Sequence, residues 1–174
     1  IYSGQLEVAS YAEQTLDVFD IVRKELHKAR LIILGGGRKL PLIRQKAEEK
    51  NLTHKVIFTN YVSGSEVPEY LSIADLALAP FEKNNVTRAK SPLKIAEYLA
   101  MGLPIIASEV GEAKKMTVGS GICVPCGDTE EMAKQALWVL RNEGIQQSMG
   151  TAGRKLAERR YNWKNNVNAL EAAY

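Results

Sequence analysis

Apolar and polar positions along this chain alternate between two patterns, one typical of buried strands and one typical of helices. Short continuous apolar runs, such as residues 31–34, end in glycine, proline or polar residues, as buried parallel strands do. Between them, apolar side chains recur at helical spacing, for example at Leu16, Phe19 and Val22. The pattern predicts strands at 1–6, 31–34, 56–59, 75–80, 104–107 and 121–124, and helices at 11–30, 38–51, 67–74, 92–101, 128–142, 145–160 and 163–173, with a short helix or loop at 111–118.

This regular alternation predicts the fold class. Strands that alternate with helices form βα units, and successive units build a parallel sheet with helices on both faces. We therefore expect an α/β fold with a doubly wound parallel sheet, in one domain spanning residues 1–174. Ligands of such sheets bind beyond the carboxyl ends of the strands. The loops after residues 6, 34, 59, 80 and 107 are the places to look for a site.

Composition limits the classes of partner that the chain could bind and leaves the predicted fold unchanged. The chain has 174 residues, is 45% hydrophobic and 25% charged, and carries a formal net charge of +3. So mild a charge does not favour a nucleic acid or an anionic membrane as a partner. No apolar run is long enough to span a bilayer, and residues 1–6 do not resemble a signal peptide.

The two cysteines, Cys123 and Cys126, form a Cys-Val-Pro-Cys motif at the end of a predicted strand. Two thiols are too few for a closed zinc site. A redox pair is one interpretation, because such motifs usually open a helix directly after a strand, and two reduced structural cysteines are the other. Reduced cysteines fit a cytoplasmic protein.

The most informative segment is the predicted helix that begins near Ser91-Pro92. Ser91 is a favourable N-cap and Pro92 a favourable first helical residue, while Gly102 is suited to the C-terminal end. The first amides, at Leu93 and Lys94, would point out of the helix at the positive end of its dipole. With Lys94 adding a full charge, the segment predicts an anion site.

Lys94, Glu97 and Tyr98 fall three and four residues apart, so we expect them to share one helix face, away from the core. A cation and a carboxylate one turn apart suit a ligand with a diphosphate at one end and hydroxyl groups nearby, such as a nucleotide sugar. The alternative is a capped surface helix on which Lys94 and Glu97 simply form an ion pair.

Other segments carry weaker signals. The turn Gly35-Gly36-Gly37 could admit a ligand close to the backbone, but it fits neither common phosphate-loop pattern. Tyr61 lies in a polar segment that could meet a base, or could be a solvent-exposed loop. Residues 81–90 read as a polar loop, either functional or a mobile connector. Trp163 is expected to anchor the last helix in the core. No metal-ligand spacing stands out.

Taken in order, these segments resemble a known family. The strand ending in the Gly35 turn, residues 56–62, 74–80, 91–108 and 121–125, and the later Gly150, Gly153 and Trp163 resemble the conserved pattern of glycosyltransferase family 4. The resemblance covers nearly the whole chain. It implies a Rossmann-like domain that is one half of a GT-B fold, namely the C-terminal, donor-binding half.

The resemblance also implies roles for residues. Glu97 would bind the donor ribose, Lys94 and the backbone of residues 91–94 would hold the diphosphate, and the Tyr61 region would meet the base. The implied donor-binding residues are Gly4, Gly36, Gly37, Tyr61, Val62, Lys90, Ser91, Pro92, Leu93, Lys94 and Glu97. The implied activity is hexosyl transfer from a nucleoside diphosphate sugar, with retention of configuration and without a metal or other cofactor. The implied partner is an N-terminal acceptor domain, through which peripheral membrane association could arise; alone, this half would be inactive.

Three positions depart from the family pattern. Ala89 stands where a second carboxylate is common, and Gln5 and Ser10 stand where two phosphate-binding cations are common. Lys94 would then carry more of the positive charge. These departures keep two alternatives open, a non-catalytic binding module derived from the GT-B fold and a sugar-nucleotide epimerase of the same fold.

Overall fold

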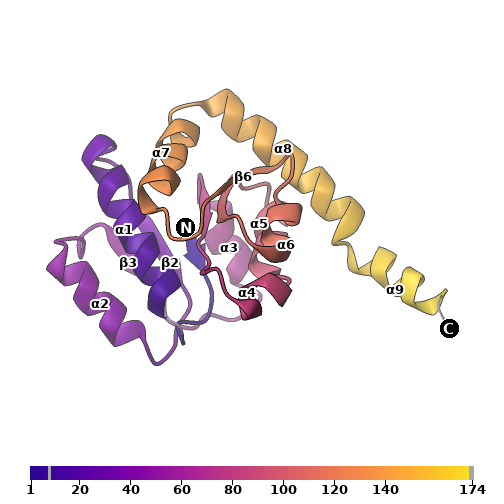
Figure 1. Cartoon of the computed structure of the whole chain (residues 1–174), viewed down its shortest axis with the longest axis horizontal. Coiled ribbons are helices and arrows are strands. Elements are labelled where there is room, and N and C mark those ends of the chain that lie inside the picture. The colour runs from indigo at the N-terminus through magenta and orange to yellow at the C-terminus, as the bar shows by residue number, and fades with distance from the viewer. Residues whose placement is uncertain (8, 173–174) are drawn as a thin grey trace.

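A computed structural model, which describes residues 1–7 and 9–172, has the alternating architecture expected from the sequence (Figure 1). The strands are β1 (Tyr2–Ser3), β2 (Leu31–Leu34), β3 (Val56–Phe58), β4 (Ala77–Ala79), β5 (Ile105–Ser108) and β6 (Gly121–Val124). The helices are α1 (Ala9–Glu25), α2 (Leu40–Glu49), α3 (Val67–Ser72), α4 (Asn85–Ala89), α5 (Leu93–Ala100), α6 (Gly111–Met116), α7 (Thr129–Leu140), α8 (Glu143–Arg160) and α9 (Trp163–Glu171).

The strands form two three-stranded parallel sheets, ordered β1-β2-β3 and β4-β5-β6. Their edges meet at β1 and β4. There the N-terminal ammonium of Ile1 donates to the Leu76 carbonyl at 2.7 Å, and the Leu78 amide donates to the Ile1 carbonyl at 2.9 Å. These bonds place the strands in the spatial order 3-2-1-4-5-6, which confirms the expected doubly wound arrangement. In such an order, the crevice beside strands 1 and 4 is where ligands bind.

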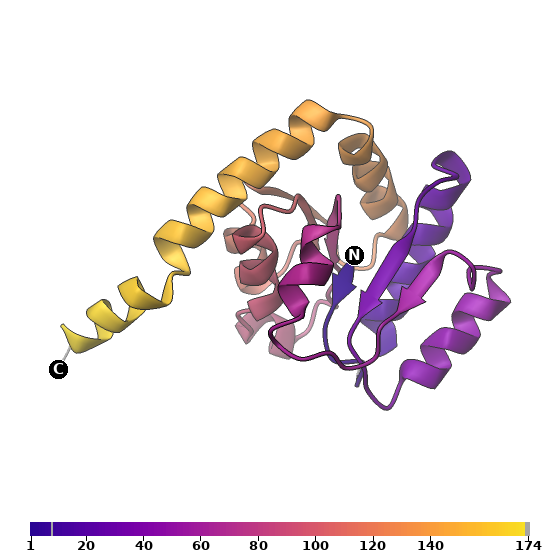
Figure 2. The same cartoon turned by 180° about the vertical axis from the view of Figure 1, so that it is seen from behind.

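Helices cover both faces of the strands, as the alternation of side chains requires (Figures 1 and 2). Leu76 and Leu78 pack toward α1 and α7, while Ala77 and Ala79 pack toward α5 and α6. On the first sheet, α1 and α2 enclose a core that includes Tyr2. α9 contacts α8 and extends away from the body of the molecule with the C-terminal end of the chain (Figure 1).

Some boundaries differ from the prediction. The first strand was expected over residues 1–6, but β1 ends at Ser3, because Gly4 adopts a φ of 151° and begins a turn. Pairing nevertheless continues irregularly, since the Gly4 amide donates to Leu34 and the Leu6 amide to Gly36. The helix expected over residues 11–30 ends at Glu25.

Residues 81–90, expected to be a loop, contain the short helix α4. Asn84 caps it through a reciprocal pair of hydrogen bonds with Thr87, and the Thr87 hydroxyl also donates to the Glu82 carbonyl at 2.5 Å. Thr87 is buried, so the segment is tied down from within.

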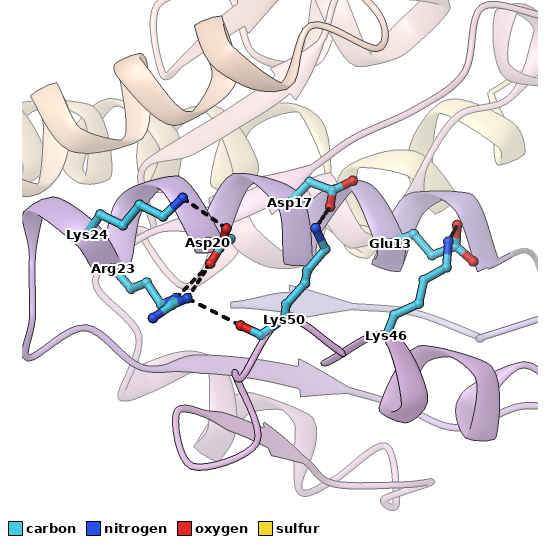
Figure 3. A network of polar contacts seen from close by, with 7 residues as sticks. All are labelled: Glu13, Asp17, Asp20, Arg23, Lys24, Lys46 and Lys50. Atoms are coloured by element: carbon cyan, nitrogen blue, oxygen red, sulfur yellow. Dashed lines mark hydrogen bonds and ion pairs between the residues drawn. The ribbon is translucent and has the colours of Figure 1, made fainter. Parts of the chain in front are cut away.

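The α1–α2 face carries a ladder of ion pairs (Figure 3). Lys46 pairs with Glu13 at 2.5 Å and Lys50 with Asp17 at 2.7 Å, each joining the two helices. Within α1, Asp20 accepts from Arg23 and Lys24, and Arg23 also donates to the Lys50 carbonyl. These contacts are partly exposed and hold α2 against α1.

Trp163 does not anchor the C-terminal helix in the core, as was expected. It is 78% exposed at the start of α9. α9 packs mainly against α8, so the Trp163 ring has no hydrophobic core to enter.

Candidate donor site at the edge of the two sheets

The start of α5 lies beside the ends of β1 and β4, where Lys94 approaches the rings of Tyr2 and Phe81. The sequence predicted Ser91 as N-cap and Pro92 as the first helical residue, but Pro92 itself is the N-cap and the helix begins at Leu93. Pro92 is extended, with φ −78° and ψ 107°, and Ser91 is exposed and makes no cap hydrogen bond. Because Pro92 has this extended backbone, it lies outside the helix, and the first helical residue is Leu93.

This start leaves backbone donors available. Proline has no side-chain acceptor, so nothing in the cap satisfies the first-turn amides. The Ile95 amide bonds to the Pro92 carbonyl at 3.0 Å, whereas the amides of Leu93 and Lys94 have no acceptor among the residues that the structure describes. Leu93 is 71% exposed. Two adjacent amides therefore face outward at the positive end of α5.

Lys94 lies at the same helix end and reaches across the end of β1. Its Nζ is 4.1 Å from the centre of the Tyr2 ring and 5.9 Å from that of Phe81. A methyl group on Gly4 would lie only 2.7 Å from this nitrogen, so the bare backbone of Gly4 makes room for it. Gly4 and Lys94, both predicted to bind the donor, thus lie side by side.

Lys94 has no ion-pair partner in the described part of the chain. The expected alternative, a Lys94–Glu97 ion pair, is therefore not formed. Burial and, to a smaller extent, the positive charge of Lys90 lower the pKa of Lys94 to about 7, against the opposing effect of Glu97. An unpaired, partly buried cation of this kind is a feature of binding sites.

Glu97 lies one turn further along α5 and is partly buried. Burial raises the pKa of its carboxyl group, and the nearby Lys94 opposes that shift. Both residues therefore favour their neutral forms more than they would in water. A ligand that supplies a negative charge to Lys94 and hydroxyl donors to Glu97 would stabilise both charged forms.

Tyr98 was expected on the same face as Lys94 and Glu97, but it is fully buried. Its hydroxyl oxygen accepts from the Ser3 amide at 2.7 Å and lies 3.0 Å from the Ser3 hydroxyl. Tyr98 therefore fastens α5 to β1 across 95 positions of sequence. Helical spacing alone could not distinguish this position from Lys94, because both are amphipathic side chains.

The glycine turn after β2 is packed against neighbouring backbone rather than open to a ligand. A methyl group on Gly36 would lie 2.8 Å from the Tyr61 ring, and one on Gly37 would lie 2.6 Å from the Leu6 carbonyl carbon. The Gly35 amide donates to Thr59 Oγ1 at 3.1 Å. These contacts fit the structural interpretation of the turn.

Arg38, the residue after this turn, already binds a carboxylate of the chain. The Arg38 amide and Nε both donate to the Glu7 carboxylate, at 3.2 and 2.7 Å, and this hydrogen bonding lowers the pKa of Glu7. The outward amides of α5 are thus better placed for a phosphate than this turn.

The remaining predicted residues line the same edge. Tyr61 is 67% exposed and lies against Gly36, and Val62 is partly buried against the core. Lys90 is exposed where α4 ends. The departures Gln5 and Ala89 are also exposed, and Ser10 lies in α1 with its side chain outside the described part of the structure.

Sequence analysis missed Tyr2 and Ser3. Tyr2 reads as an ordinary strand residue, and no local signal links it to Lys94, since the contact joins segments far apart in the chain. Two surface hollows, of about 850 and 660 Å³, are lined mainly by α1, α7 and the amino-terminal side of the strands, and contain none of the predicted site residues.

The cysteines favour a structural role. Both thiols are free, and burial raises the pKa of each, which disfavours the reactive thiolate. Cys123 Sγ lies 2.9 Å from Thr117 Oγ1. α7 begins at Thr129, so Cys126 does not open a helix as the redox interpretation required.

Two properties of the described residues concern metals and membranes. No group of three His, Cys, Asp or Glu side chains is placed to hold a metal ion, and the expectation of a metal-free site stays a prediction. None of the helices within residues 1–7 and 9–172 has the length and apolar character needed to cross a membrane.

Comparison with known proteins gives a match over most of the chain. The family model described as "Glycosyl transferases group 1" matches residues 1–142. A GDP-mannose-dependent alpha-(1-6)-phosphatidylinositol monomannoside mannosyltransferase of Mycobacterium tuberculosis is 27% identical over 146 residues, covering 82% of this chain and 38% of that protein. The chain thus spans well under half the length of this relative.

Solved structures share the fold. The C-terminal domain of a group 1 family glycosyl transferase, LpcC of Francisella tularensis, aligns with a TM-score of 0.78 at 15% identity, covering 93% of this chain and 85% of that one. Anabaena HepE in complex with UDP aligns with a TM-score of 0.72 at 15% identity, covering 98% of this chain and 48% of that one.

Proposed function

This chain belongs to the group 1 glycosyltransferase family, and we propose that it is the donor-binding half of an enzyme that transfers a hexose from a nucleoside diphosphate sugar to an acceptor. The observation that carries the proposal is the unpaired Lys94 ammonium beside the two outward amides of α5. A diphosphate would satisfy both amides and the cation at once, where the helix dipole also favours negative charge.

Glu97 is proposed to bind the ribose hydroxyls. It lies one helical turn, about 5.4 Å of rise, beyond the outward amides, on the face that carries Lys94. A carboxylate accepts two hydroxyl hydrogen bonds well, and such bonds would offset the burial that raises its pKa. Tyr61 stands exposed after β3, against Gly36, and is proposed to meet the base.

The chemistry proposed for this half is stabilisation of the leaving group. As the bond between sugar and diphosphate breaks, negative charge grows on the diphosphate oxygen. The Leu93 and Lys94 amides and the Lys94 ammonium are preorganised to interact with that charge, and need little rearrangement to do so. Retention of configuration and independence of a metal are part of the proposal.

The acceptor is proposed to bind a second, N-terminal half. The relative from Mycobacterium tuberculosis is much longer than this chain, and the first-turn amides of α5 face outward, where a second half could meet the same donor. This half alone is expected to bind nucleotide without catalysing transfer. Any membrane association would come through the acceptor half.

The direct test is calorimetric titration of the 174-residue chain with UDP, GDP and ADP. Binding of at least one nucleotide, and its weakening in Lys94→Met, supports the donor site. If a folded chain, judged by circular dichroism, binds none of the three at millimolar concentration, the proposal is wrong.

The ribose role of Glu97 makes a sharper prediction. Glu97→Ala should weaken binding of the preferred nucleotide about 5- to 30-fold, equivalent to about 1–2 kcal/mol of lost hydrogen bonding. Inorganic pyrophosphate has no ribose and should bind the variant as well as it binds the native chain, or slightly better. Equal losses for nucleotide and pyrophosphate would contradict the assignment.

A second candidate function is a binding module without turnover. Gln5 and Ala89 favour it, since they stand exposed at the site's edge and supply neither cation nor carboxylate. The discriminating measurement is hydrolysis or transfer of donor sugar by the full-length protein. Nucleotide binding without any turnover, across a panel of donors and acceptors, would favour the module.

A further inference from the structure

The cation of the proposed donor site is held by an aromatic ring and not by a carboxylate. Lys94 Nζ stands 4.1 Å from the centre of the Tyr2 ring, well within the range of a cation–π contact. Phe81, at 5.9 Å, adds a second and weaker aromatic neighbour. A ring attracts the ammonium through its quadrupole but carries no net charge, so the positive charge of Lys94 is not neutralised.

The titratable neighbours leave this interpretation intact. Burial, together with the proximity of Tyr98 and Tyr11, raises the pKa of Tyr2, so its phenol stays protonated and attracts Lys94 by its ring face only. On the helix side, Lys90 repels the ammonium and Glu97 attracts it without forming an ion pair.

The backbone at the end of β1 fixes the geometry of this contact. Tyr98 bonds to Ser3, the neighbour of Tyr2, and so fastens β1 to the helix that carries Lys94. Gly4 then leaves the space that the Lys94 side chain crosses. Tyr2 itself is 1% exposed and packed in the core between α1 and α2, so its ring has little freedom to move.

We propose that Tyr2 is a positioning residue of the donor site: its ring holds the Lys94 ammonium at the crevice beside the outward amides of α5, and leaves the charge available for the diphosphate. The inference rests on the proposed function, because it names what orients the cation of that same site. A carboxylate in the place of Tyr2 would hold Lys94 equally well but would compete with the ligand for its charge.

The test compares two variants of Tyr2 by nucleotide titration of the 174-residue chain at pH 7. Tyr2→Leu, which removes the ring, should weaken UDP binding about 5- to 30-fold. Tyr2→Phe keeps the ring face and should bind within about twofold of the native chain. Phe19→Leu is the matched control, since it removes a ring from the same core cluster; it should leave the affinity unchanged.

A double-mutant cycle separates positioning from general loosening of the fold. In the Lys94→Met background, Tyr2→Leu should have no further effect on UDP binding, because Tyr2 is proposed to act through Lys94 alone. If Tyr2→Leu weakens binding equally in both backgrounds, or if Phe19→Leu weakens it as much, Tyr2 has only a structural role and the inference is overturned.

A second measurement does not need a nucleotide. In the ligand-free chain, the Lys94 Cε protons should show an upfield NMR shift from the Tyr2 ring current, which Tyr2→Leu abolishes and Tyr2→Phe retains. An unshifted signal, or one that Tyr2→Leu leaves unchanged, overturns the inference even if nucleotides bind. A native chain that shows the shift but binds no nucleotide overturns the proposed donor site instead, and with it the ligand assigned to Lys94.

Discussion

The cations between α1 and α2 each meet a carboxylate, whereas the cation between β1 and α5 meets an aromatic ring. Lys46 and Lys50 pair with Glu13 and Asp17 at 2.5 and 2.7 Å (Figure 3). Lys94 lies over the Tyr2 ring, and burial lowers its pKa, whereas the ion pair with Asp17 raises the pKa of Lys50. Lysine side chains in the first region are thus paired with a negative charge, whereas Lys94 is not.

The comparison shows which of the two regions lowers the stability of the folded chain. Partly exposed ion pairs contribute little, about 0–1 kcal/mol each, and serve mainly to align two helices. A partly buried lysine without a counter-ion is destabilising, because burial removes the water that solvates the ammonium and no opposite charge compensates for that loss. Such a cost is characteristic of functional sites, and the structure places it at the crevice where parallel sheets bind their ligands.

The largest effect should come from removing the unpaired cation. Lys94→Met is expected to weaken nucleoside diphosphate binding about 10- to 150-fold, the value of a charged hydrogen bond. It should also raise the free energy of unfolding at pH 7 by at least about 1.4 kcal/mol, the equivalent of one pKa unit, since the native pKa of about 7 lies well below the usual pKa of a lysine. Calorimetry and denaturant unfolding measure the two effects.

Lys50→Met is the matched control from the paired face. It should leave nucleotide affinity unchanged and lower the free energy of unfolding slightly, because Asp17 loses its ion-pair partner at a partly exposed position. If both substitutions change stability in the same direction, the two regions do not differ as described.

The next effect is the pH dependence at Lys94. Above about pH 7 the ligand-free amine loses its proton, and a diphosphate must restore it, so affinity should fall by up to about tenfold per pH unit. Stability should move the other way: the unfolded chain binds more protons than the native chain between pH 7 and about 10, so stability rises with pH there. Lys90, Glu97 and Tyr2 are the titratable groups that face Lys94.

Lys94→Arg provides the control for this pH profile, because a guanidinium stays charged throughout. Its UDP affinity, measured from pH 7 to 9, should be nearly flat. A native profile that is also flat over this range would show that Lys94 is not the group that titrates on binding.

The smallest effect should come from the paired face. Asp17→Asn is expected to lower the free energy of unfolding by about 0.2–1 kcal/mol at low salt, and less in 1 M NaCl, because salt screens partly exposed charges. Nucleotide affinity should not change. The measurement is urea unfolding at two ionic strengths, and a loss above about 2 kcal/mol would show that this ion pair is more than a surface contact.

Much of the fold could be predicted from local pattern. Buried parallel strands appear as apolar runs, and β2 and β6 have the predicted bounds. The Gly102 turn after α5 and the Asp128 cap of α7 follow from local backbone chemistry, and both are present. Such features depend on a few neighbouring residues, which is why sequence alone predicts them.

Predictions failed where the local pattern allowed more than one arrangement. Ser91 is a good N-cap by composition, but Pro92 is extended, with a ψ of 107°, and the helix starts at Leu93. Tyr98 has the spacing of a site residue, yet its hydroxyl accepts a hydrogen bond from the Ser3 amide in the core. Trp163 is apolar enough for a core, but α9 extends away from it.

By itself, the sequence determined the alternation of strands and helices along the chain, apart from α4, as well as the α/β class, the family resemblance and the segment that carries Lys94 and Glu97, because these depend on periodicity and on short motifs. Only the tertiary structure decided that Lys94 lies over an aromatic ring and forms no ion pair in the described part of the chain, and that Gly4 makes room for it. The physical reason is that an electrostatic environment is made by residues far apart in the chain, whose proximity no local pattern encodes.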